Sequence, residues 1–499
     1  FYSFLHSATT TPARAVRLLS MIAAHSWRTA QSLGYARSQR SNHLITEAVG
    51  LWTAGTLYPE LKSAKLWQRA GAQLLREAVL DQITPEGVSQ QHSFNYQRMI
   101  LQLLLWALRL SEVSGVPLDG CVRERTASAF DFMRSVVDPI SGHAPNYGSN
   151  DGSLILPLSA CECGDFRPLL QLGAAVLDRP ALPVGAWDEA ALWLGAQPGA
   201  APAERSCHAP HAETGCFKLG DENSWALIRA GRYSRRPFQA DQLHVDLWWK
   251  GLNLARDAGT YLYNGDPPSD NSFARTCVHN TVTVDGRDQM RRAGRFLWLD
   301  WAQAVGEYQA DSSGTHTSIS AEHDGYKRLG ITHRRTVHWL GAAGWVITDD
   351  LLGSGEHDLR LHWLTPDLPF EPCDSPFRVQ FKTANEQQIC WQIFSSCDGQ
   401  HAIVRAGQSS SPEIAGCDLP RLGWESPTYG ELRPAVSLIC ETNRLLPVRF
   451  VTLVLVNSEC NVERESDHIL VCRESTPLFT TSVLPEQNVP SRERRGQSR

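Results

Sequence analysis

Hydrophobic residues in the first part of the chain recur at intervals of three and four positions, which places them along one face of an α-helix. Short stretches of Pro, Gly and Ser separate these segments, so consecutive helices are expected to pack as antiparallel neighbours. The helices predicted in this way are Arg14–Leu33, His43–Thr56, Ala64–Ile83, Asn95–Ser114 and Glu124–Val137.

After about residue 210 the pattern changes to short runs of alternating or β-branched hydrophobic residues, with Gly, Asp and Pro between them. Many short strands joined by frequent turns are typical of an antiparallel sandwich. The clearest predicted strands lie within 281–284, 336–339, 345–348 and 450–456.

The two patterns together predict a helical domain over 1–200 and an antiparallel β-sandwich domain over 205–485. The stretch from Gln197 to Glu204 is rich in Pro, Ala and Gly, which indicates a linker. The polar, Arg-rich residues 486–499 are expected to form a disordered tail. The chain starts at Phe1 without a signal-peptide pattern, so we expect a processed chain or one that lacks its N-terminal part.

Charge and cysteine content exclude several classes of protein. The 499 residues carry a net charge of −6, which argues against binding nucleic acid through a basic face. There is no run of about 18 uncharged apolar residues, so no membrane span is expected. The 13 Cys residues are odd in number and form no CxxC pair, so neither a disulfide scaffold nor a zinc ribbon is indicated. The sequence does not define an oligomeric state.

Two polar clusters lie at predicted helix starts. Ser41 suits the N-cap position, which puts Asn42 and His43 in the first turn, and Tyr96 lies in the first turn of a helix capped by Ser93 or Asn95. Helix N-termini carry partial positive charge and favour an anion. If alternate helices run parallel, both clusters lie at the same end of the domain. Ordinary helix caps are the simpler explanation for either cluster alone.

A third group of polar residues belongs to the sandwich domain. His244, Asp257 and His279 are expected on three strands, and two imidazoles with one carboxylate can bind zinc if those strands are neighbours. The alternative is that all three are ordinary hydrogen-bonded residues. The loop from Asn146 to Gly152 is dense in polar and turn-forming residues, and it is either a simple turn or the wall of a site.

Taken together, these segments resemble the heparinase II/III family of polysaccharide lyases, which includes related alginate lyases. The resemblance extends from about residue 35 to beyond 350, and His244 to Gln289 is its most specific part. It rests on Asn42-His43, Ser93 to Tyr96, Gly148 to Asp151, His244-Val-Asp-Leu-Trp, Asp257-Ala-Gly-Thr-Tyr261 and His279-Asn280-Thr-Val. It implies an N-terminal incomplete (α/α) toroid followed by a C-terminal antiparallel β-sandwich. It also implies an enzyme that cleaves uronic-acid polysaccharide by β-elimination.

The resemblance assigns roles to individual residues. Tyr96 resembles the catalytic tyrosine, and Asn42 and His43 resemble the residues that face the uronate carboxylate. The zinc ligands would be His244, Asp257 and His279, with the metal in a structural role. The further candidates for substrate binding are Gln91, Asn95, Arg98, Gln242 and Tyr261.

Gln242 is a departure from the family pattern, because several members have a catalytic histidine two positions before the first zinc histidine. Glutamine can donate a hydrogen bond but cannot take up a proton. Three explanations are open. The role is dispensable, another histidine such as His92 or His323 supplies it, or His244 is itself catalytic.

The chemistry of β-elimination explains why these residue types are needed. The C5 proton of a uronate becomes acidic only when the adjacent carboxylate is neutralised or hydrogen-bonded, a role that suits Asn42 and His43. A free tyrosine has a pKa of about 10, so Tyr96 would need nearby positive charge or donors, such as Arg98 and the helix start. The same tyrosine could then return its proton to the leaving oxygen.

Two other functions fit the same sequence. A glycoside hydrolase on a helical toroid would need two carboxyl groups, for which Glu47, Glu86 and Asp151 are available. The second alternative function is that of a catalytically silent homologue that binds carbohydrate. Polymer degradation would suit a periplasmic or secreted protein, and the sequence does not say which polysaccharide is bound.

Overall fold

A computed structural model of the chain shows two compact units, which are treated separately below. One consists of Phe1–Val137 with Gly142–His208, and the other of Asp138–Ser141 with Ala209–Arg499. The structure describes residues 7–8, 10–197, 199, 215–266, 270–310, 316–373, 377–411, 421–456, 460–473 and 476–485. The predicted linker, apart from Gln197 and Gly199, and the predicted tail lie outside these described residues.

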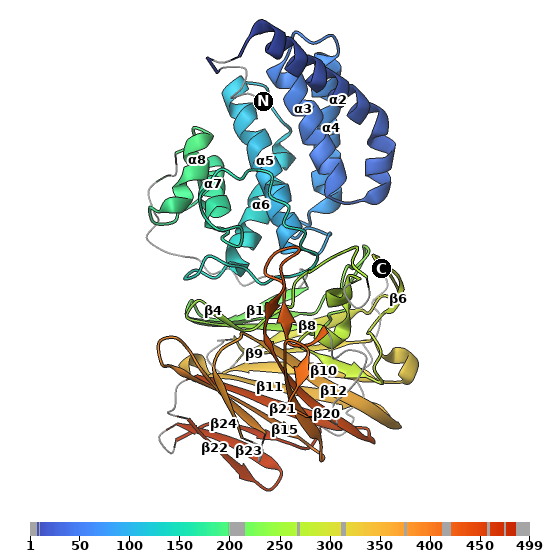
Figure 1. Cartoon of the computed structure of the whole chain (residues 1–499), viewed down its shortest axis with the longest axis vertical. Coiled ribbons are helices and arrows are strands. Elements are labelled where there is room, and N and C mark those ends of the chain that lie inside the picture. The colour runs from blue at the N-terminus through green and yellow to red at the C-terminus, as the bar shows by residue number, and fades with distance from the viewer. Residues whose placement is uncertain are drawn as a thin grey trace, which may run out of the picture. The chain divides into compact units, whose positions relative to one another are not determined.

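The first unit is helical (Figure 1). All five predicted helices are present. The first ends at Gln39 instead of Leu33 and the fifth begins at Gly120 instead of Glu124, while the ends of the other three shift by at most one residue. The short helices α7 and α8 were not predicted. The α-helices are α2 (Pro12–Gln39), α3 (Asn42–Leu57), α4 (Ala64–Gln82), α5 (Phe94–Ser114), α6 (Gly120–Val136), α7 (Arg167–Leu177) and α8 (Glu189–Trp193).

Helix α5 is the centre of this unit. It is buried along most of its length, as expected for a helix that is hydrophobic on nearly every face. Helix α2 differs, because only Ser26 and Ala36 of its residues are buried. None of the described helices is long and apolar enough to cross a membrane.

The second unit is built from antiparallel strands (Figure 1). Its largest sheets have the orders β13-β14-β15-β21-β11-β10-β9-β8, β17-β16-β20-β12-β5 and β1-β2-β3-β4. Their strands are β1 (Cys216–Gly220), β2 (Ser224–Arg229), β3 (Val245–Trp249), β4 (Leu252–Ala255), β5 (Val282–Val284), β8 (Ala304–Ala310), β9 (His316–His323), β10 (Thr332–Trp339), β11 (Gly344–Leu352), β12 (Glu356–Thr365), β13 (Phe370–Cys373), β14 (Arg378–Lys382), β15 (Gln388–Ser395), β16 (Gln400–Arg405), β17 (Gln408–Ser409), β20 (Val436–Leu445) and β21 (Val448–Val456).

Three smaller sheets complete this unit. They consist of β6 (Arg291–Gly294) with β7 (Leu297–Leu299), β18 (Trp424–Glu425) with β19 (Arg433–Pro434), and β22 (Cys460–Glu465) with β23 (His468–Arg473) and β24 (Thr476–Ser482).

One hydrophobic core joins the three large sheets. Trp363 of β12 and Trp391 of β15 meet at a centroid distance of 5.5 Å, and Phe217 of β1 lies 5.4 Å from Tyr308 of β8. Side chains from facing sheets therefore interdigitate, which is how a sandwich buries its inner faces. The predicted fold class, a helical toroid followed by an antiparallel β-sandwich, is confirmed.

Candidate functional site

The start of helix α3 is held by a residue from outside the helix. Ser41 is the N-cap, as predicted, but its hydroxyl makes no capping hydrogen bond. Instead, the side-chain oxygen of Gln91 accepts the backbone N–H of Asn42 at 3.0 Å. Because Gln91 lies just before α5, this contact joins the starts of α3 and α5. The predicted placement of the two polar clusters at the same end is confirmed.

Asn42 and His43 have side chains that are available for a ligand. Asn42 is half-buried and His43 is exposed. Among the described residues, neither the Asn42 amide nor the His43 imidazole has a hydrogen-bond partner in a side chain or the backbone. A neutral amide donor and an imidazole therefore face solvent beside a helix N-terminus, where an anion is favoured.

Ser93 holds the loop from Asn146 to Gly152 at the start of α5 by hydrogen bonds. Its hydroxyl accepts the backbone N–H of Tyr96 at 3.1 Å, which makes Ser93 the cap, and it donates to the carbonyl of Ser149 at 2.6 Å. The backbone N–H of Phe94 donates to the carbonyl of Tyr147 at 3.0 Å. This loop is therefore part of the site.

Gly148 allows the loop to approach α5 so closely. Its φ is +76°, and a Cβ atom added there would lie 2.0 Å from the carbonyl oxygen of His92. We expect Gly148→Ala to lower the free energy of unfolding by more than the roughly 1–2 kcal/mol that a left-handed alanine costs. Gly115→Ala is the control, because Gly115 has φ +69° with no atom within 4 Å of the added Cβ. Equal losses for the two variants in thermal denaturation would contradict this explanation.

The Tyr96 phenol lies against a carboxylate. Its hydroxyl donates to Oδ2 of Asp151 at 2.7 Å. The other carboxylate oxygen accepts the Ser153 hydroxyl at 2.5 Å, the Ser153 backbone N–H at 3.0 Å and the Asn95 amide at 3.4 Å. Asp151 is thus held in place by several donors and presents one oxygen to the phenol. The sequence named Asp151 only as part of a loop and as a carboxyl for a hydrolase, so this pair was not predicted.

Arg98 supports this arrangement from within the unit. Its guanidinium donates to Oδ1 of Asn95 at 2.7 Å and to the carbonyl of Cys163, and it lies 4.8 Å from the centre of the Phe166 ring. Burial lowers the pKa of Arg98. Asn95 in turn gives its amide to Asp151. Arg98 and Asn95 are both buried, so the structure places them as supports of Asp151 and not on a sugar-facing surface.

Glu47 lies one helical turn after His43, on the same face of α3. Burial raises the pKa of its carboxyl more than the charge of His43 lowers it. Its Oε2 atom is buried and has no hydrogen-bond partner among the described residues. Glu47 is therefore a carboxyl with a raised pKa, one helical turn from the exposed imidazole.

In the sandwich unit, His244, Asp257 and His279 lie together just outside the strands on which they were expected. His244 comes directly before β3, Asp257 follows β4, and His279 follows the short 3-10 helix η4 (Thr276–Val278). Nε2 of His279 is 3.4 Å from Oδ2 of Asp257, and the two imidazole rings meet edge to face at 5.4 Å. All three side chains are buried.

His279 has the tautomer of a metal ligand. Its Nδ1 lies 2.7 Å from the carbonyl oxygen of Arg275, and since a carbonyl only accepts, Nδ1 carries the hydrogen. In the neutral ring Nε2 then holds the lone pair. This buried atom lies 3.4 Å from Oδ2 of Asp257 and makes no well-aligned hydrogen bond to any described residue. Burial alone would lower the pKa of His279, but Asp257 and Asp241 outweigh it and the pKa rises. Burial would raise the pKa of Asp257, but His279 and His244 lower it.

The third ligand has two candidates, of which His244 is the less suited. It accepts the backbone N–H of Asn280 on Nδ1 at 3.0 Å, so the neutral ring carries its hydrogen on Nε2, which lies 3.3 Å from Oδ2 of Asp246. His244 would have to give up the Asn280 hydrogen bond and change tautomer to bind a metal through Nε2. Asp241 was not predicted, yet its carboxylate lies within 4.8 Å of the ligand atoms of Asp257 and His279. Asp241 also accepts a hydrogen bond from Arg229 at 2.6 Å. These buried groups could hold a divalent cation.

Gln242 has a structural place that the sequence did not show. Its side chain is fully buried, and its amide nitrogen donates to the carbonyls of Gly231 and Ala302 at 2.7 and 2.9 Å. Its side-chain oxygen accepts the N–H of Gly231 at 3.1 Å. Because both amide hydrogens are used inside the unit, we do not keep Gln242 as a substrate contact.

The other candidates from the sequence also have defined places. Tyr261 is half-buried and packs against a hydrophobic cluster that includes Ala258 and Phe273. His323, considered as a replacement for the missing histidine, is buried and bonded to His333, and burial holds its pKa far below the usual value. It is therefore unsuited to proton transfer with a substrate. His92 lies directly before Ser93 with φ 53°.

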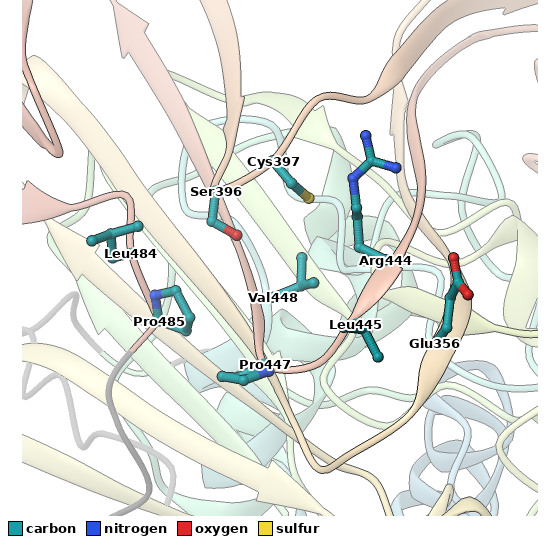
Figure 2. Close-up of a pocket in the computed structure, with 9 residues that line it drawn as sticks. All are labelled: Glu356, Ser396, Cys397, Arg444, Leu445, Pro447, Val448, Leu484 and Pro485. Atoms are coloured by element: carbon teal, nitrogen blue, oxygen red, sulfur yellow. The ribbon is translucent and has the colours of Figure 1, made fainter.

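The sandwich unit also has an open hollow of about 430 Å³ (Figure 2). None of the candidate site residues lines it. The lining residues are Glu356, Ser396, Cys397, Arg444, Leu445, Pro447, Val448, Leu484 and Pro485. We assign it no role in the chemistry described above.

These features define a two-part protein. A helical toroid carries Asn42 and His43 at one helix start and Tyr96 at another, with Gln91 joining the two starts, and a β-sandwich carries a buried histidine–aspartate cluster. The chain belongs to the heparinase II/III-like family. The family model for the heparinase II/III-like C-terminal region matches residues 203–465, and that for the heparinase II/III N-terminus matches residues 1–119.

The similar proteins support the same family. A heparin-sulfate lyase of Bacteroides stercoris is 23% identical over 373 residues, which cover 70% of this chain and 50% of that protein. A solved structure of a heparinase III gene product has a TM-score of 0.71 at 18% identity and covers 96% of this chain and 70% of its own. A solved structure of a heparan sulfate lyase mutant from Pedobacter heparinus has a TM-score of 0.65 at 17% identity. It covers 97% of this chain and 72% of that chain. The chain spans about half the length of the first of these relatives.

Proposed function

We propose that this chain is a polysaccharide lyase that cleaves a uronic-acid glycosaminoglycan of the heparin-sulfate type by β-elimination. Membership of the heparinase II/III-like family and the similarity to heparin-sulfate lyases support this proposal. The observation that carries it is the hydrogen bond between the Tyr96 phenol and Asp151. The same unit holds the side chains of Asn42 and His43, which have no hydrogen-bond partner among the described residues.

Asn42 and His43 would stabilise the charge that develops during proton removal. When the C5 proton leaves, negative charge spreads onto the uronate carboxylate. Donors that are already positioned lower the free energy of that state without reorganisation at the moment of reaction. Both side chains lie in the first turn of α3, where the helix N-terminus adds partial positive charge.

Tyr96 and Asp151 would move the protons. As the phenol oxygen takes the C5 proton, its own proton passes to Oδ2 of Asp151, so Tyr96 need not exist as a free phenolate. The C4–O bond then breaks as the C4–C5 double bond forms, and the phenol proton goes to the leaving oxygen. The Asp151 proton returns to Tyr96 and restores the starting state. Arg98 and Asn95 would hold Asp151 in place through this cycle.

We also propose that the buried cluster of the sandwich unit binds zinc in a structural role. His279 and Asp257 would be two of the ligands, with His244 or Asp241 completing the set. The buried Nε2 of His279 supports this proposal, because it holds the lone pair when the ring is neutral and makes no well-aligned hydrogen bond among the described residues. When bound, zinc would supply cross-linking of the segments that carry these residues, and the elimination chemistry stays with the helical unit.

The proposed activity is tested by incubating the protein with heparan sulfate, heparin, hyaluronan and alginate and following near-ultraviolet absorbance. We expect absorbance to rise with heparan sulfate or heparin, because elimination creates a conjugated unsaturated uronate. New reducing ends without absorbance would instead show a hydrolase. Binding without either product would show a carbohydrate-binding protein.

A further inference from the structure

A single buried guanidinium touches both segments that carry the histidine cluster. Arg335 of β10 donates from Nη1 to the carbonyl oxygen of Leu243 at 2.7 Å and to the carbonyl oxygen of Asn280. Leu243 directly precedes His244, and Asn280 directly follows His279. The side chain is fully buried and lies 4.9 Å from the centre of the Trp363 ring. Arg335 therefore fixes the distance between the two segments at their backbones.

The backbone at Leu243 needs this support from Arg335. Its φ is +61°, in the left-handed region, which a leucine rarely occupies unless its surroundings hold it there. Its backbone N–H donates to the carbonyl of Arg229 at 2.7 Å, and its carbonyl is held by Arg335. This turn directs the next residue, His244, toward His279.

The charge of Arg335 is balanced inside the sheet. Asp349, its direct partner on β11, accepts from Nε at 2.6 Å and from Nη2 at 3.0 Å. His333 lies 2.7 Å from Oδ1 of Asp349, and Nε2 of His323 lies 3.2 Å from Nδ1 of His333. The N–H of Gly325 donates to Nδ1 of His323, so each imidazole donates toward Asp349. This chain of hydrogen bonds keeps the carboxylate oriented toward the guanidinium.

Asn280 connects the two segments a second time. Its backbone N–H donates to Nδ1 of His244 at 3.0 Å, and its side-chain nitrogen donates to the carbonyl of Val245 at 2.8 Å. The position of Asn280 therefore decides the orientation of the His244 ring. Arg335 holds the carbonyl of this same residue.

We propose that Arg335 is the positioning residue of the His244–His279 cluster, and that it sets the zinc affinity of this cluster without contacting the metal. This inference builds on the zinc site of the proposed function. It is independent of the elimination chemistry, because all of its contacts lie in the sandwich unit.

The chain offers a closely matched control. Arg449 of β21 pairs with Asp350, the next residue of β11, through bonds of 2.6 and 2.7 Å, and both side chains are buried. Neighbouring residues of a strand point to opposite faces, so this second pair faces away from Arg335. The Arg449 side chain also donates to the carbonyl of Ser482.

The experiment compares Arg335→Lys with Arg449→Lys. Lysine keeps the charge but loses the planar fork that reaches Asp349 and two carbonyls together. We expect Arg335→Lys to weaken zinc binding by about 10–100-fold, as for other groups that orient ligands. Arg449→Lys should stay within about twofold of the wild type, since it orients no ligand. Zinc affinity is measured by competition with a chromophoric chelator. Hydrogen exchange of the Asn280 amide is followed in the metal-free protein, where we expect faster exchange only in Arg335→Lys.

A second pair of variants covers the case in which Arg335→Lys does not fold. Arg335→Met with Asp349→Asn removes both charges and leaves none unpaired, and Arg449→Met with Asp350→Asn is its control. Unchanged zinc affinity and exchange in the Arg335 variants, or equal changes in both pairs, would overturn the inference. If the wild type binds no zinc, the zinc proposal fails, and exchange of the Asn280 amide alone then decides the role of Arg335.

Discussion

Tyr96→Phe is expected to lower the rate of elimination by about 10²–10⁴-fold, the range for loss of a positioned acid–base group. Phenylalanine keeps the ring but removes the oxygen that would take the C5 proton and protonate the leaving group. Initial rates of absorbance increase on heparan sulfate provide the measurement. Tyr35→Phe is the control, because Tyr35 lies exposed on α2. The elimination rate and the thermal transition of Tyr35→Phe should match those of the wild type.

Asp151→Asn separates the proposed proton path from simple placement of the phenol. Asparagine can still hydrogen-bond to Tyr96 and Ser153, but it cannot accept a proton from Tyr96. If Asp151 takes that proton, the rate should fall by about 10²-fold or more while the thermal transition changes little. A rate near that of the wild type would remove Asp151 from the proton path. Activity that survives Tyr96→Phe unchanged would remove Tyr96 as the base.

The helical part of the site could be read from the sequence because its signals are local. Ser41 and Ser93 are cap residues, and the spacing of hydrophobic residues gives the helices that they start. Two parallel helix starts with short connections bring the clusters to the same end. What the sequence could not show is that the Gln91 side chain accepts the Asn42 N–H, because that contact joins residues far apart in the chain.

Asp151 was missed for the same reason. It lies 55 residues after Tyr96, and no local pattern links a loop aspartate to a tyrosine on an earlier helix. The approach depends on the left-handed φ of Gly148 and on hydrogen bonds from Ser93 and Phe94. A Gly-rich polar loop predicts a turn, but the partner of that turn is set by tertiary packing.

The role of Gln242 shows the limit of a family pattern. Its place in the motif suggested a residue at a substrate, but its amide is used by the backbone of Gly231 and Ala302. Glutamine is usually exposed in proteins, so the residue type alone could not predict that Gln242 is buried. Asp241, its neighbour, instead turns toward Asp257 and His279, and no spacing rule pointed to it.

His279→Ala is expected to lower zinc content and stability together. The substitution removes the Nε2 lone pair and leaves Asp257 without its main neighbouring group in a buried site. Removing one partner of a buried charged pair typically costs about 3–5 kcal/mol, and loss of bound metal adds to this. The measurements are zinc per chain by elemental analysis and the thermal transition with and without a chelator.

The chelator distinguishes a metal effect from a packing effect. In the wild type it should lower the transition temperature, because a ligand that binds only the folded state stabilises it by mass action. In His279→Ala the chelator should leave the transition temperature unchanged. His401→Ala is the control, because His401 stacks on Phe377 at 4.5 Å outside the cluster, so it should keep the zinc of the wild type. A wild-type protein that contains no zinc, or a variant that loses stability but keeps its zinc, would show that His279 serves packing alone.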